Sequence, residues 1–328
     1  MTPTHIESNG EIELKIVVIT GCLGFIGSQI TRDCLNLGYK VLGIDKCTYA
    51  ANNELLPEFL EDKNFTFKRE DICEIDSIPD CDYIINTAAE THVGNSIQDS
   101  KEFTKTNILG IQNILDLIRK KPSNVCSRPV LLHFSTDEVY GDIASGSHKE
   151  NDLMNPSNPY SASKAAADLM ITSWARTYGI EYVILRPTNN YGNYQYPEKL
   201  VPLVVKLLKR NKKIRLHDEG TPVRNWLHVE DTSNAVLEIM KSGVKNEIYN
   251  ISGGFEQENI LTVKKIINAF DSTMDWKNHV NLDFKRPGQD VRYSLDDQKI
   301  RSIGWSPIKN FDEQICKIVN FYKQNFKW

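Results

Sequence analysis

Three glycines, Gly21, Gly24 and Gly27, stand between a short β-branched run and a helical pattern, and they narrow the possible folds more than any other feature. Residues 15–20 read KIVVIT, which is typical of a strand buried on both faces. In a strand–turn–helix unit the first glycine permits a tight turn, the second lets backbone N–H groups approach a pyrophosphate, and the third lets helix and strand pack closely. The spacing GxxGxxG alone is a weak signal, and a purely structural glycine turn is the alternative.

An acidic residue follows at the place that a dinucleotide-binding unit requires. The next predicted strand covers residues 40–45 and ends at Asp45, which is 18 residues beyond Gly27. A carboxylate there accepts hydrogen bonds from both hydroxyls of an adenosine ribose and repels a 2′-phosphate. The combination predicts binding of NAD in preference to NADP. Asp71 and Ile72 follow the next apolar stretch and could contact the adenine, although alone they indicate no more than a surface turn.

The first half of the chain alternates strand and helix patterns. Helices are expected from the glycine turn to residue 37, up to residue 121 and over 161–178, and strands at 15–20, 40–45, 82–89, 130–135 and 181–186. Such alternation predicts an α/β fold with a Rossmann-type doubly wound parallel sheet and right-handed crossovers.

The second half predicts a smaller C-terminal α/β substrate-binding domain at the carboxyl edge of that sheet. Its patterns are a helix over 198–209, a hairpin-like segment at 213–226, a strand at 247–251 and a terminal helix near 313–326. We expect a disordered leader at 1–13, a NAD-binding Rossmann domain at 14–187 with a returning segment near 227–251, and the substrate domain mainly at 188–328.

The composition of the 328 residues excludes several other classes of protein. A hydrophobic share of 40% with a net charge of −4 is unlike a disordered chain, and no basic stripe indicates nucleic acid binding. The apolar runs fall far below the ~20 residues that span a bilayer, and no secretory signal begins the chain. The seven cysteines form no CxxC pair, and the histidines lack metal-ligand spacing. We therefore predict a cytoplasmic protein with reduced thiols and no metal, nucleic-acid or membrane partner.

Tyr160 and Lys164 stand four residues apart at the start of a predicted helix, so they share one face. A neighbouring ammonium lowers the pKa of a tyrosine, which is about 10 when unperturbed. Such a tyrosine can remove a proton from a sugar hydroxyl while hydride leaves the same carbon for NAD⁺, and the lysine can also hold the nicotinamide ribose. The YxxxK pattern occurs by chance in many helices, so it carries weight only beside the dinucleotide loop.

Two adjacent carboxylates, Asp137 and Glu138, follow the buried strand pattern that ends at Ser135. If the chain bends there, both can face a ligand at the carboxyl edge of the sheet. One could stay protonated and act as an acid while the other acts as a base. Two solvated loop carboxylates are the alternative.

These motifs together resemble the extended short-chain dehydrogenase/reductases, and within them the nucleotide-sugar 4,6-dehydratases. The resemblance runs from about residue 15 to about residue 305. The Asp-Glu pair after Thr136 is its specific marker, because related epimerases and decarboxylases of nucleotide sugars do not carry it there. The matching segments are GCLGFIGS, DKCTYA, AAETHV, TNILG, STDEVYG, NPYSASKAAAD, NNYGNYQYPEKLVP, EGTPVRNWLHVED, YNISGG and RPGQDVRYSLD.

The resemblance implies a reaction in which C4 of an NDP-glucose is oxidised, water is eliminated across C5–C6 and hydride returns to C6. Tyr160 would be the base at the C4 hydroxyl, with Thr136 hydrogen-bonded to that oxygen and Lys164 beside them. Glu138 would remove the C5 proton, and Asp137 would protonate the departing C6 hydroxyl. The redox cycle closes on itself, so NAD would be tightly held and regenerated in each turnover.

The resemblance also implies which residues bind the two ligands. NAD would contact Gly21, Gly24, Phe25, Ile26, Gly27, Asp45, Lys46, Thr48, Asp71, Ile72, Ala88, Ala89, Tyr160 and Lys164. The nucleotide sugar would contact His92, Asn190, Glu198, Lys199, Leu200, His217, Arg224, Asn259 and Arg286. The guanidinium groups of Arg224 and Arg286 suit a diphosphate, although each alone could be a surface salt bridge. His92 alone would indicate a buried core histidine.

The sequence departs from the bacterial dTDP-glucose members at three places. They commonly read HVDRS, YGDG and RDW where this chain has HVGNS at residues 92–96, HDEG at 217–220 and RNW at 224–226. The role of Gly94 and Asn95 is left open. His217 and Arg224-Asn225 are typical of UDP-glucose members, whereas DKCTYA is typical of the dTDP type. We therefore expect UDP-glucose as the substrate. The alternative is dTDP-glucose, because uracil and thymine differ by one methyl, and one methyl allows a protein to discriminate by only ~1–3 kcal/mol.

Two other functions remain as alternatives. A nucleotide-sugar 4-epimerase would need Tyr160 and Lys164 but no base at C5. A non-catalytic NAD-binding regulator would be expected to lose Tyr160 or Lys164. Family members are usually homodimers that pair two long helices from each subunit, so we expect a homodimer through the helices near 97–121 and 161–178. The product is expected to enter deoxysugar synthesis, with rhamnose as the common destination in the family.

Overall fold

A computed structural model describes residues 15–122, 128–284 and 290–325. The leader expected at 1–13 and the predicted ligand Arg286 lie outside the described residues. The chain divides into two compact units, and each combines separate stretches of sequence. The first unit holds the described residues up to Thr136, with Asn158–Arg186 and Ser233–Tyr249; the second holds Asp137–Ser157, Pro187–Thr232 and the described residues from Asn250 onward.

A seven-stranded sheet forms the centre of the first unit, in the order β10-β6-β5-β4-β1-β2-β3. The pairs β1–β2, β2–β3, β1–β4, β4–β5 and β5–β6 are all parallel. This doubly wound order confirms the predicted fold class. The strands are β1 (Ile16–Thr20), β2 (Lys40–Ile44), β3 (Phe65–Lys68), β4 (Tyr83–Asn86), β5 (Val130–Phe134), β6 (Tyr182–Pro187) and β10 (Glu247–Ile251).

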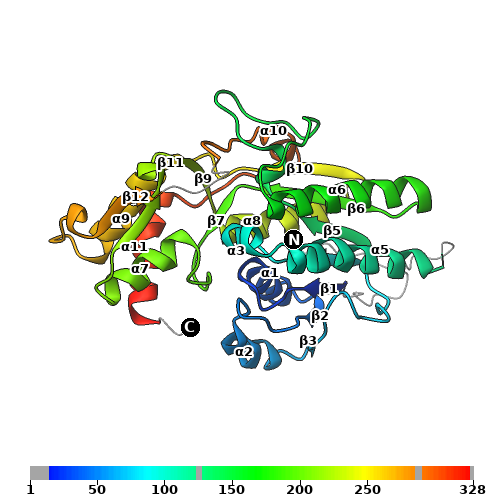
Figure 1. Cartoon of the computed structure of the whole chain (residues 1–328). Coiled ribbons are helices and arrows are strands. Elements are labelled where there is room, and N and C mark those ends of the chain that lie inside the picture. The colour runs from blue at the N-terminus through cyan, green and yellow to red at the C-terminus, as the bar shows by residue number, and fades with distance from the viewer. Residues whose placement is uncertain (1–14, 123–127, 285–289, 326–328) are drawn as a thin grey trace. The chain divides into compact units, whose positions relative to one another are not determined.

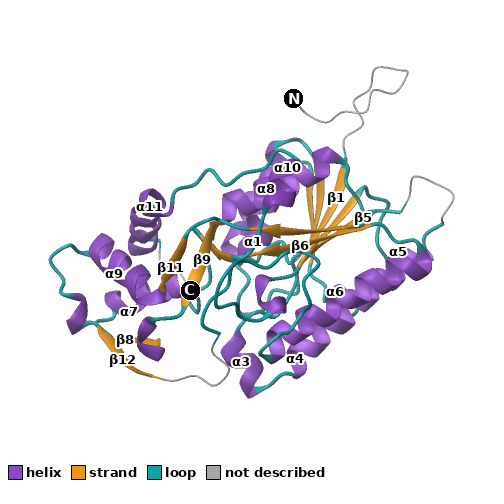
Figure 2. Cartoon of the chain, turned by 90° about the horizontal axis from the view of Figure 1, so that it is seen from above, coloured by secondary structure: helices purple, strands orange, loops and turns teal. Residues whose placement is uncertain are grey.

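Helices cover both faces of this sheet (Figure 2). Helices α5 and α6 lie side by side on one face, and α1 and α8 lie on the other. The apolar side chains of α5 that recur at helical spacing, Ile111, Ile114, Leu115 and Ile118, are buried in the core under the sheet. The helices of this unit are α1 (Phe25–Asn36), α2 (Leu56–Leu60), α3 (Val93–Gln98), α4 (Lys101–Thr104), α5 (Gly110–Lys120), α6 (Pro159–Tyr178) and most of α8 (Val229–Ser242).

The second unit has a separate core and two small sheets, with orders β11-β9-β7 and β12-β8. The hairpin predicted at 213–226 is wrong, because β8 pairs in parallel with β12 while β9 pairs with β7 and β11. The elements are β7 (Asn189–Tyr191), α7 (Leu200–Lys209), β8 (Ile214–His217), β9 (Val223–His228), β11 (Glu256–Glu258), α9 (Asn259–Phe270), β12 (Val280–Phe284), α10 (Gln298–Ser302) and α11 (Phe311–Gln324).

Candidate active site

The glycine turn between β1 and α1 is packed so closely that side chains would not fit. Gly21 has φ +70°, and a Cβ at Gly27 would lie 2.1 Å from the carbonyl oxygen of Gly21. Gly24 is the N-cap of α1 and offers no side chain to the first-turn N–H groups, and no acidic residue occupies that turn. Phe25, Ile26 and Gly27 form the first turn itself. Free N–H donors at the N-terminus of a twelve-residue helix suit a pyrophosphate.

A pocket of about 90 Å³ opens beside this turn in the first unit. It contains most of the residues that the sequence assigned to the cofactor: Gly21, Gly24, Asp45, Lys46, Thr48, Asp71, Ile72, Ala88 and Ala89. It also contains residues that sequence reasoning missed: Ile44, Ala50, Ala51, Glu70, Thr87, Glu90 and Thr106. The glycine turn and the carboxylate of Asp45 line the same pocket, so one ligand there can contact both.

Backbone contacts fix the carboxylate of Asp45 at the end of β2. Its Oδ2 accepts a hydrogen bond from the N–H of Leu23 at 3.0 Å, and its Oδ1 accepts one from the N–H of Cys47 at 2.7 Å. Burial raises the pKa of Asp45, and the two backbone hydrogen bonds oppose that rise. Each oxygen keeps a lone pair, so the group can still accept hydrogen bonds from a ribose diol.

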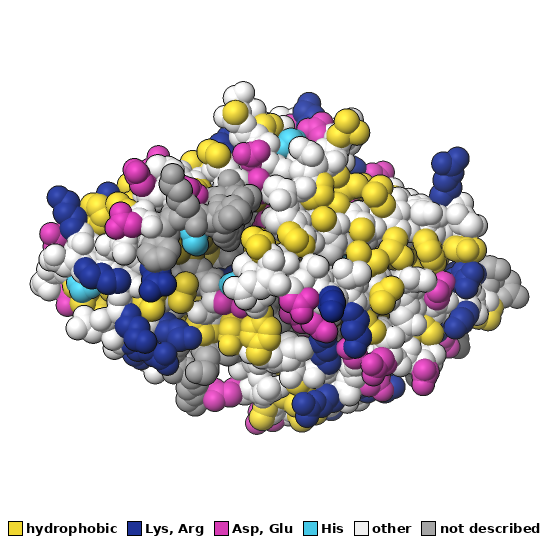
Figure 3. All heavy atoms as spheres, viewed as in Figure 1, with side chains coloured by type: hydrophobic (Ala, Val, Ile, Leu, Met, Phe, Trp, Pro, Cys, Tyr) yellow, Lys and Arg dark blue, Asp and Glu magenta, His cyan; other side chains and the backbone are white. Residues whose placement is uncertain are grey.

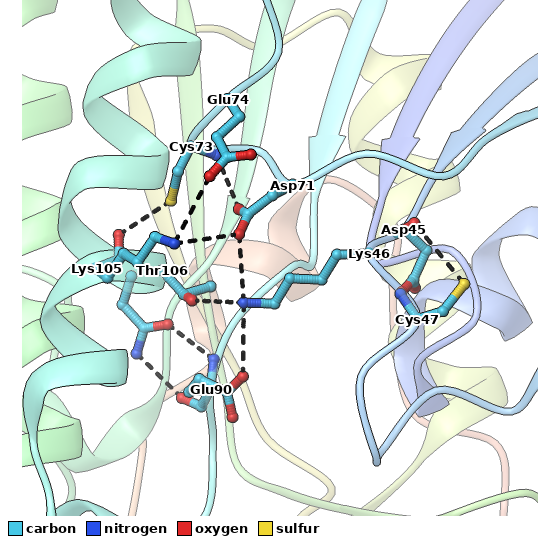
Figure 4. A network of polar contacts seen from close by, with 10 residues as sticks. Asp45, Lys46, Cys47, Asp71, Cys73, Glu74, Glu90, Lys105 and Thr106 are labelled. Atoms are coloured by element: carbon cyan, nitrogen blue, oxygen red, sulfur yellow. Dashed lines mark hydrogen bonds and ion pairs between the residues drawn. The ribbon is translucent and has the colours of Figure 1, made fainter.

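Lys46 points away from Asp45 into a cluster of opposite charge (Figure 4). Its Nζ donates to Oγ1 of Thr106 at 3.1 Å and lies 3.7 Å from Asp71 Oδ2 and 3.9 Å from Glu90 Oε1. Burial acts to raise the pKa of Asp71, but hydrogen bonds from Cys73 and the charge of Lys46 outweigh it and lower that pKa. The carboxylates of Asp71 and Glu90, which line the same pocket, therefore hold the ammonium of Lys46. Thr106 and Glu90 escaped prediction because only the folded chain brings them to Lys46.

Tyr160 and Lys164 lie on consecutive turns of α6, at positions that local sequence determines. Asn158 caps the helix by accepting from the N–H of Ser161 at 3.0 Å, and Ser161 Oγ accepts from the N–H of Asn158 at 3.2 Å. This capping box and Pro159 at the first helical position fix where the helix begins. Both Tyr160 and Lys164 are buried. Burial lowers the pKa of Lys164 to about 8, against the opposing charge of Asp168.

Thr136, Asp137 and Glu138 follow β5, and the chain passes from the first unit to the second between Thr136 and Asp137. Asp137 and Glu138 open a 3₁₀ turn that ends at Tyr140. The two carboxylates occupy different environments, because the residue Asp137 is 2% exposed while Glu138 is only half-buried. Tyr140 anchors the turn by donating to Oδ1 of Asn250 at 2.9 Å.

The described residues predicted to bind the sugar nucleotide lie in the second unit, apart from His92. Arg224 stacks on the ring of Tyr293 at 4.6 Å and donates to the carbonyl of Asp290 at 3.1 Å. Asn190 lies in β7 and accepts from Thr232 Oγ1 at 2.5 Å. Glu198 and Lys199 form an ion pair at 3.6 Å directly before Leu200, the first residue of α7. His217 ends β8, and Asn259 begins α9. The interaction of Arg224 with Tyr293 was missed because 69 residues separate them.

His92 lies in the first unit, where it caps the short helix α3. Its Nδ1 accepts a hydrogen bond from the N–H of Asn95 at 3.0 Å. A Cβ at Gly94 would lie 2.9 Å from Cε1 of this ring, so glycine leaves room for the capping histidine. The divergent Gly94-Asn95 pair thereby has a local structural reason.

Comparisons with known proteins identify close relatives over nearly the whole chain. The family profile described as GDP-mannose 4,6 dehydratase matches residues 18–318. A dTDP-glucose 4,6-dehydratase of Streptomyces niveus is 38% identical over 326 residues, which cover 95% of this chain and 94% of the relative. A dTDP-glucose 4,6-dehydratase of Escherichia coli is 35% identical over 344 residues, with 95% and 94% covered.

Solved structures give the same result. The dTDP-glucose 4,6-dehydratase of Streptomyces venezuelae, crystallised with NAD, superposes with a TM-score of 0.89 at 36% identity and covers 94% of this chain and 97% of its own. The UDP-glucose 4-epimerase of Thermotoga maritima has a TM-score of 0.84 at 24% identity, with 95% and 100% covered, which shows a shared fold alone. In the part of the chain that the structure describes, no helix is long and apolar enough to cross a membrane.

Proposed function

Since the chain belongs to the nucleotide-sugar 4,6-dehydratases of the extended short-chain dehydrogenase/reductases, we propose that it converts dTDP-glucose to dTDP-4-keto-6-deoxyglucose. The observation that carries this proposal is the similarity, over about 95% of the chain, to relatives named as dTDP-glucose 4,6-dehydratases. These relatives favour dTDP-glucose over the UDP-glucose expected from His217 and Arg224-Asn225. Those positions occur in a chain that is similar over about 95% of its length to relatives of the dTDP type, so they are weak indicators of the base.

The cofactor of this hydro-lyase is NAD, which supplies the hydride acceptor for C4 and the hydride donor for C6 when it is bound. The glycine turn and the first turn of α1 would hold its pyrophosphate. Asp45 would accept hydrogen bonds from the adenosine ribose. Lys164 would hold the nicotinamide ribose beside Tyr160. Asp71 and Ile72 would contact the adenine.

Tyr160 acts as the base on the sugar's C4 hydroxyl. The positive charge of Lys164, one helical turn away, favours the phenolate form of Tyr160 and so prepares it to accept that proton. Thr136 donates a hydrogen bond to the same sugar oxygen. Buried surroundings strengthen each of these interactions, because little water screens them.

Glu138 and Asp137 then divide the elimination between them. The ketone at C4 acidifies the C5 proton, which passes to the carboxylate of Glu138. Asp137 gives its proton to the C6 hydroxyl, which leaves as water. Asp137 is the more buried of the two carboxylates, and Glu138 is the more exposed. Arg224, Asn190, Glu198, Lys199, Leu200, His217, Asn259 and His92 are proposed to hold the sugar nucleotide, with the guanidinium of Arg224 on the diphosphate.

A side-by-side assay with no added NAD⁺ tests the proposal. Purified protein receives dTDP-glucose or UDP-glucose, and mass spectrometry follows the loss of one water from each nucleotide sugar. Faster loss from dTDP-glucose is the expected result. Faster loss from UDP-glucose would restore the UDP assignment. Conversion to the galactose epimer without change of mass would contradict the roles of Asp137 and Glu138.

A further inference from the structure

One histidine, His133, interrupts the apolar strand β5, an interior strand of the seven-stranded sheet. All five residues of this strand, VLLHF, are buried, and His133 is 1% exposed. Burial, followed by the nearby charge of Lys164, lowers the pKa of His133 well below its ordinary value, so the ring is neutral. A side chain buried this deeply needs hydrogen-bond partners on both ring nitrogens, because an unpaired buried polar atom destabilises the fold.

The partners of His133 form a buried chain that ends at Lys164. Thr20 Oγ1 donates to Oδ1 of Asn86 at 2.6 Å, and Nδ2 of Asn86 lies 3.0 Å from Nδ1 of His133. Nε2 of His133 lies 3.3 Å from Nζ of Lys164. The chain crosses three neighbouring strands, β1, β4 and β5, before it reaches α6. Rigid strands therefore fix the imidazole in place.

A competing group lies on the same face of α6, one turn beyond Lys164. Oδ2 of Asp168 is bound by Ser135 Oγ at 3.0 Å and by Nε of Arg186 at 2.9 Å. Oδ1 of Asp168 is buried and has no hydrogen-bond partner among the described residues. The titratable groups at Lys164 are thus His133 from β5 and Asp168 from α6, with Arg186 from β6 paired to Asp168. Tyr160 lies one turn before Lys164 on α6. A carboxylate oxygen attracts an ammonium more strongly than a neutral imidazole does. The position of Nζ beside Nε2 of His133, and not beside Oδ1 of Asp168, therefore requires an explanation.

We propose that His133 is a positioning residue for Lys164, which keeps Nζ away from Asp168 and available to Tyr160. The proposal rests on the proposed function, because that function gives Lys164 the role of lowering the pKa of Tyr160. His133 itself touches neither the sugar nor the reacting atoms in this account. Without its hydrogen bond, Nζ turns one helical turn along α6 to the free oxygen of Asp168, and Tyr160 loses the charge that favours its phenolate.

Two amide variants separate positioning from packing. In His133→Gln the side-chain amide reaches the position of Nε2 and can still bind Lys164. In His133→Asn the amide reaches only the position of Nδ1, so it keeps the contact with Asn86 and loses Lys164. Both variants are neutral and polar, and thermal melting followed by circular dichroism checks that each one folds.

The first measurement is the pH dependence of kcat/KM for dTDP-glucose. In His133→Asn we expect the acid limb to move up by about one pH unit, which is a tenfold loss on that limb, with little change in KM. His133→Gln should stay within threefold of the wild type. Equal impairment of the two variants, or an unchanged profile in a folded His133→Asn, would overturn the proposal.

A second measurement does not depend on turnover. NMR titration of protein carrying [ε-¹³C]lysine, with the resonance assigned by Lys164→Arg, reports the pKa of Lys164 directly. We expect that pKa to rise in His133→Asn, because the ammonium gains an ion pair with Asp168, and to stay unchanged in His133→Gln. If the wild type fails to dehydrate dTDP-glucose, the proposed function fails, while this titration still decides whether His133 positions Lys164.

Discussion

In the proposed mechanism, Glu138 is the residue that separates a dehydratase from an epimerase on this fold. Glu138→Gln keeps the size of the side chain but removes the base for the C5 proton. We expect loss of water to slow by at least about 10²-fold while oxidation at C4 continues, so that reduced cofactor accumulates and absorbs in the near ultraviolet. Glu61→Gln, at an exposed carboxylate in the first unit, serves as the matched control. Full dehydratase activity in Glu138→Gln would contradict the assigned role.

Gly27 lies so close to the backbone of Gly21 that there is no room for a side chain. In Gly27→Ala the new Cβ would meet the carbonyl oxygen of Gly21 at 2.1 Å, so strand and helix must separate. We expect retained NAD to fall at least tenfold in the purified protein, as measured by its release after heating. Gly38→Ala is the control, because nothing lies within 4 Å of its Cβ and only the positive φ adds a cost of about 1 kcal/mol. Normal NAD content in Gly27→Ala would contradict the close packing.

Lys164 makes stability depend on pH in a direction that can be worked out. Its pKa in the folded chain is about 8, below the unfolded value of roughly 10.4. Between these values the unfolded chain binds more protons, so stability rises with pH through this window and the cost of burying the charge is fully present below it. Lys164→Met should therefore be the more stable protein near pH 7, by roughly 1–3 kcal/mol, and inactive. Urea unfolding of both proteins should show the gap narrowing from pH 8 to 10; a constant gap would contradict this account.

Local spacing is what made residues predictable. Gly21, Gly24, Asp45 and the Tyr160–Lys164 pair could be proposed from the sequence because each depends on neighbours within about one strand and one helix of sequence. His133 was missed because a single histidine inside an apolar strand gives no signal of what lies behind it. Its partners Asn86 and Lys164 come from other elements, and only the sheet order brings them together.

At the scale of elements, we expect the N-cap of α6 to couple helix stability to the proposed catalytic pair, Tyr160 and Lys164. Asn158→Ala removes the capping hydrogen bond two residues before Tyr160, which should cost about 1 kcal/mol of stability. We also expect kcat to fall several-fold, since Tyr160 lies in the turn that frays. Asn158→Asp retains a capping oxygen and is the control. Chemical denaturation and steady-state kinetics check both effects, and equal behaviour of the two variants would refute the coupling.

The elements themselves were predicted where one pattern decided them. The buried runs of β1 and β5 and the spacing of α5 carry their own signal. The hairpin predicted at 213–226 was wrong because the strands there are short and pair with strands far along the chain. Ile214 in β8 pairs with Val280, and Arg224 in β9 pairs with Gln257 in β11. Long-range pairing of this kind overrides the local preference for a hairpin.

At the scale of the whole molecule, the expected homodimer remains a prediction with a defined surface. Hydrophobic side chains gather on the face of the first unit formed by α5 and α6 (Figure 3). Leu169 in α6 is 59% exposed, and Leu109, directly before α5, is 51% exposed. Contiguous exposed apolar patches of this kind mark interaction surfaces. We expect Leu169→Glu to halve the mass measured by light scattering, whereas Leu153→Glu, at a leucine outside this face, should not. A wild-type protein that is monomeric by light scattering would contradict the expected homodimer.

The first unit is assembled from three separated stretches, and this has a consequence for its biosynthesis. Strand β10, which closes the sheet beside β6, ends at Ile251, 64 residues after β6 ends at Pro187. At about 5–20 residues per second, a ribosome needs roughly 3 to 13 seconds to synthesise that interval. Throughout it the nascent chain presents the unpaired edge of β6, a template for wrong pairing between chains. Nascent chains stalled after β6 has emerged and before residue 247 is made should therefore recruit chaperones that bind exposed strands, and those stalled well beyond residue 251 should release them.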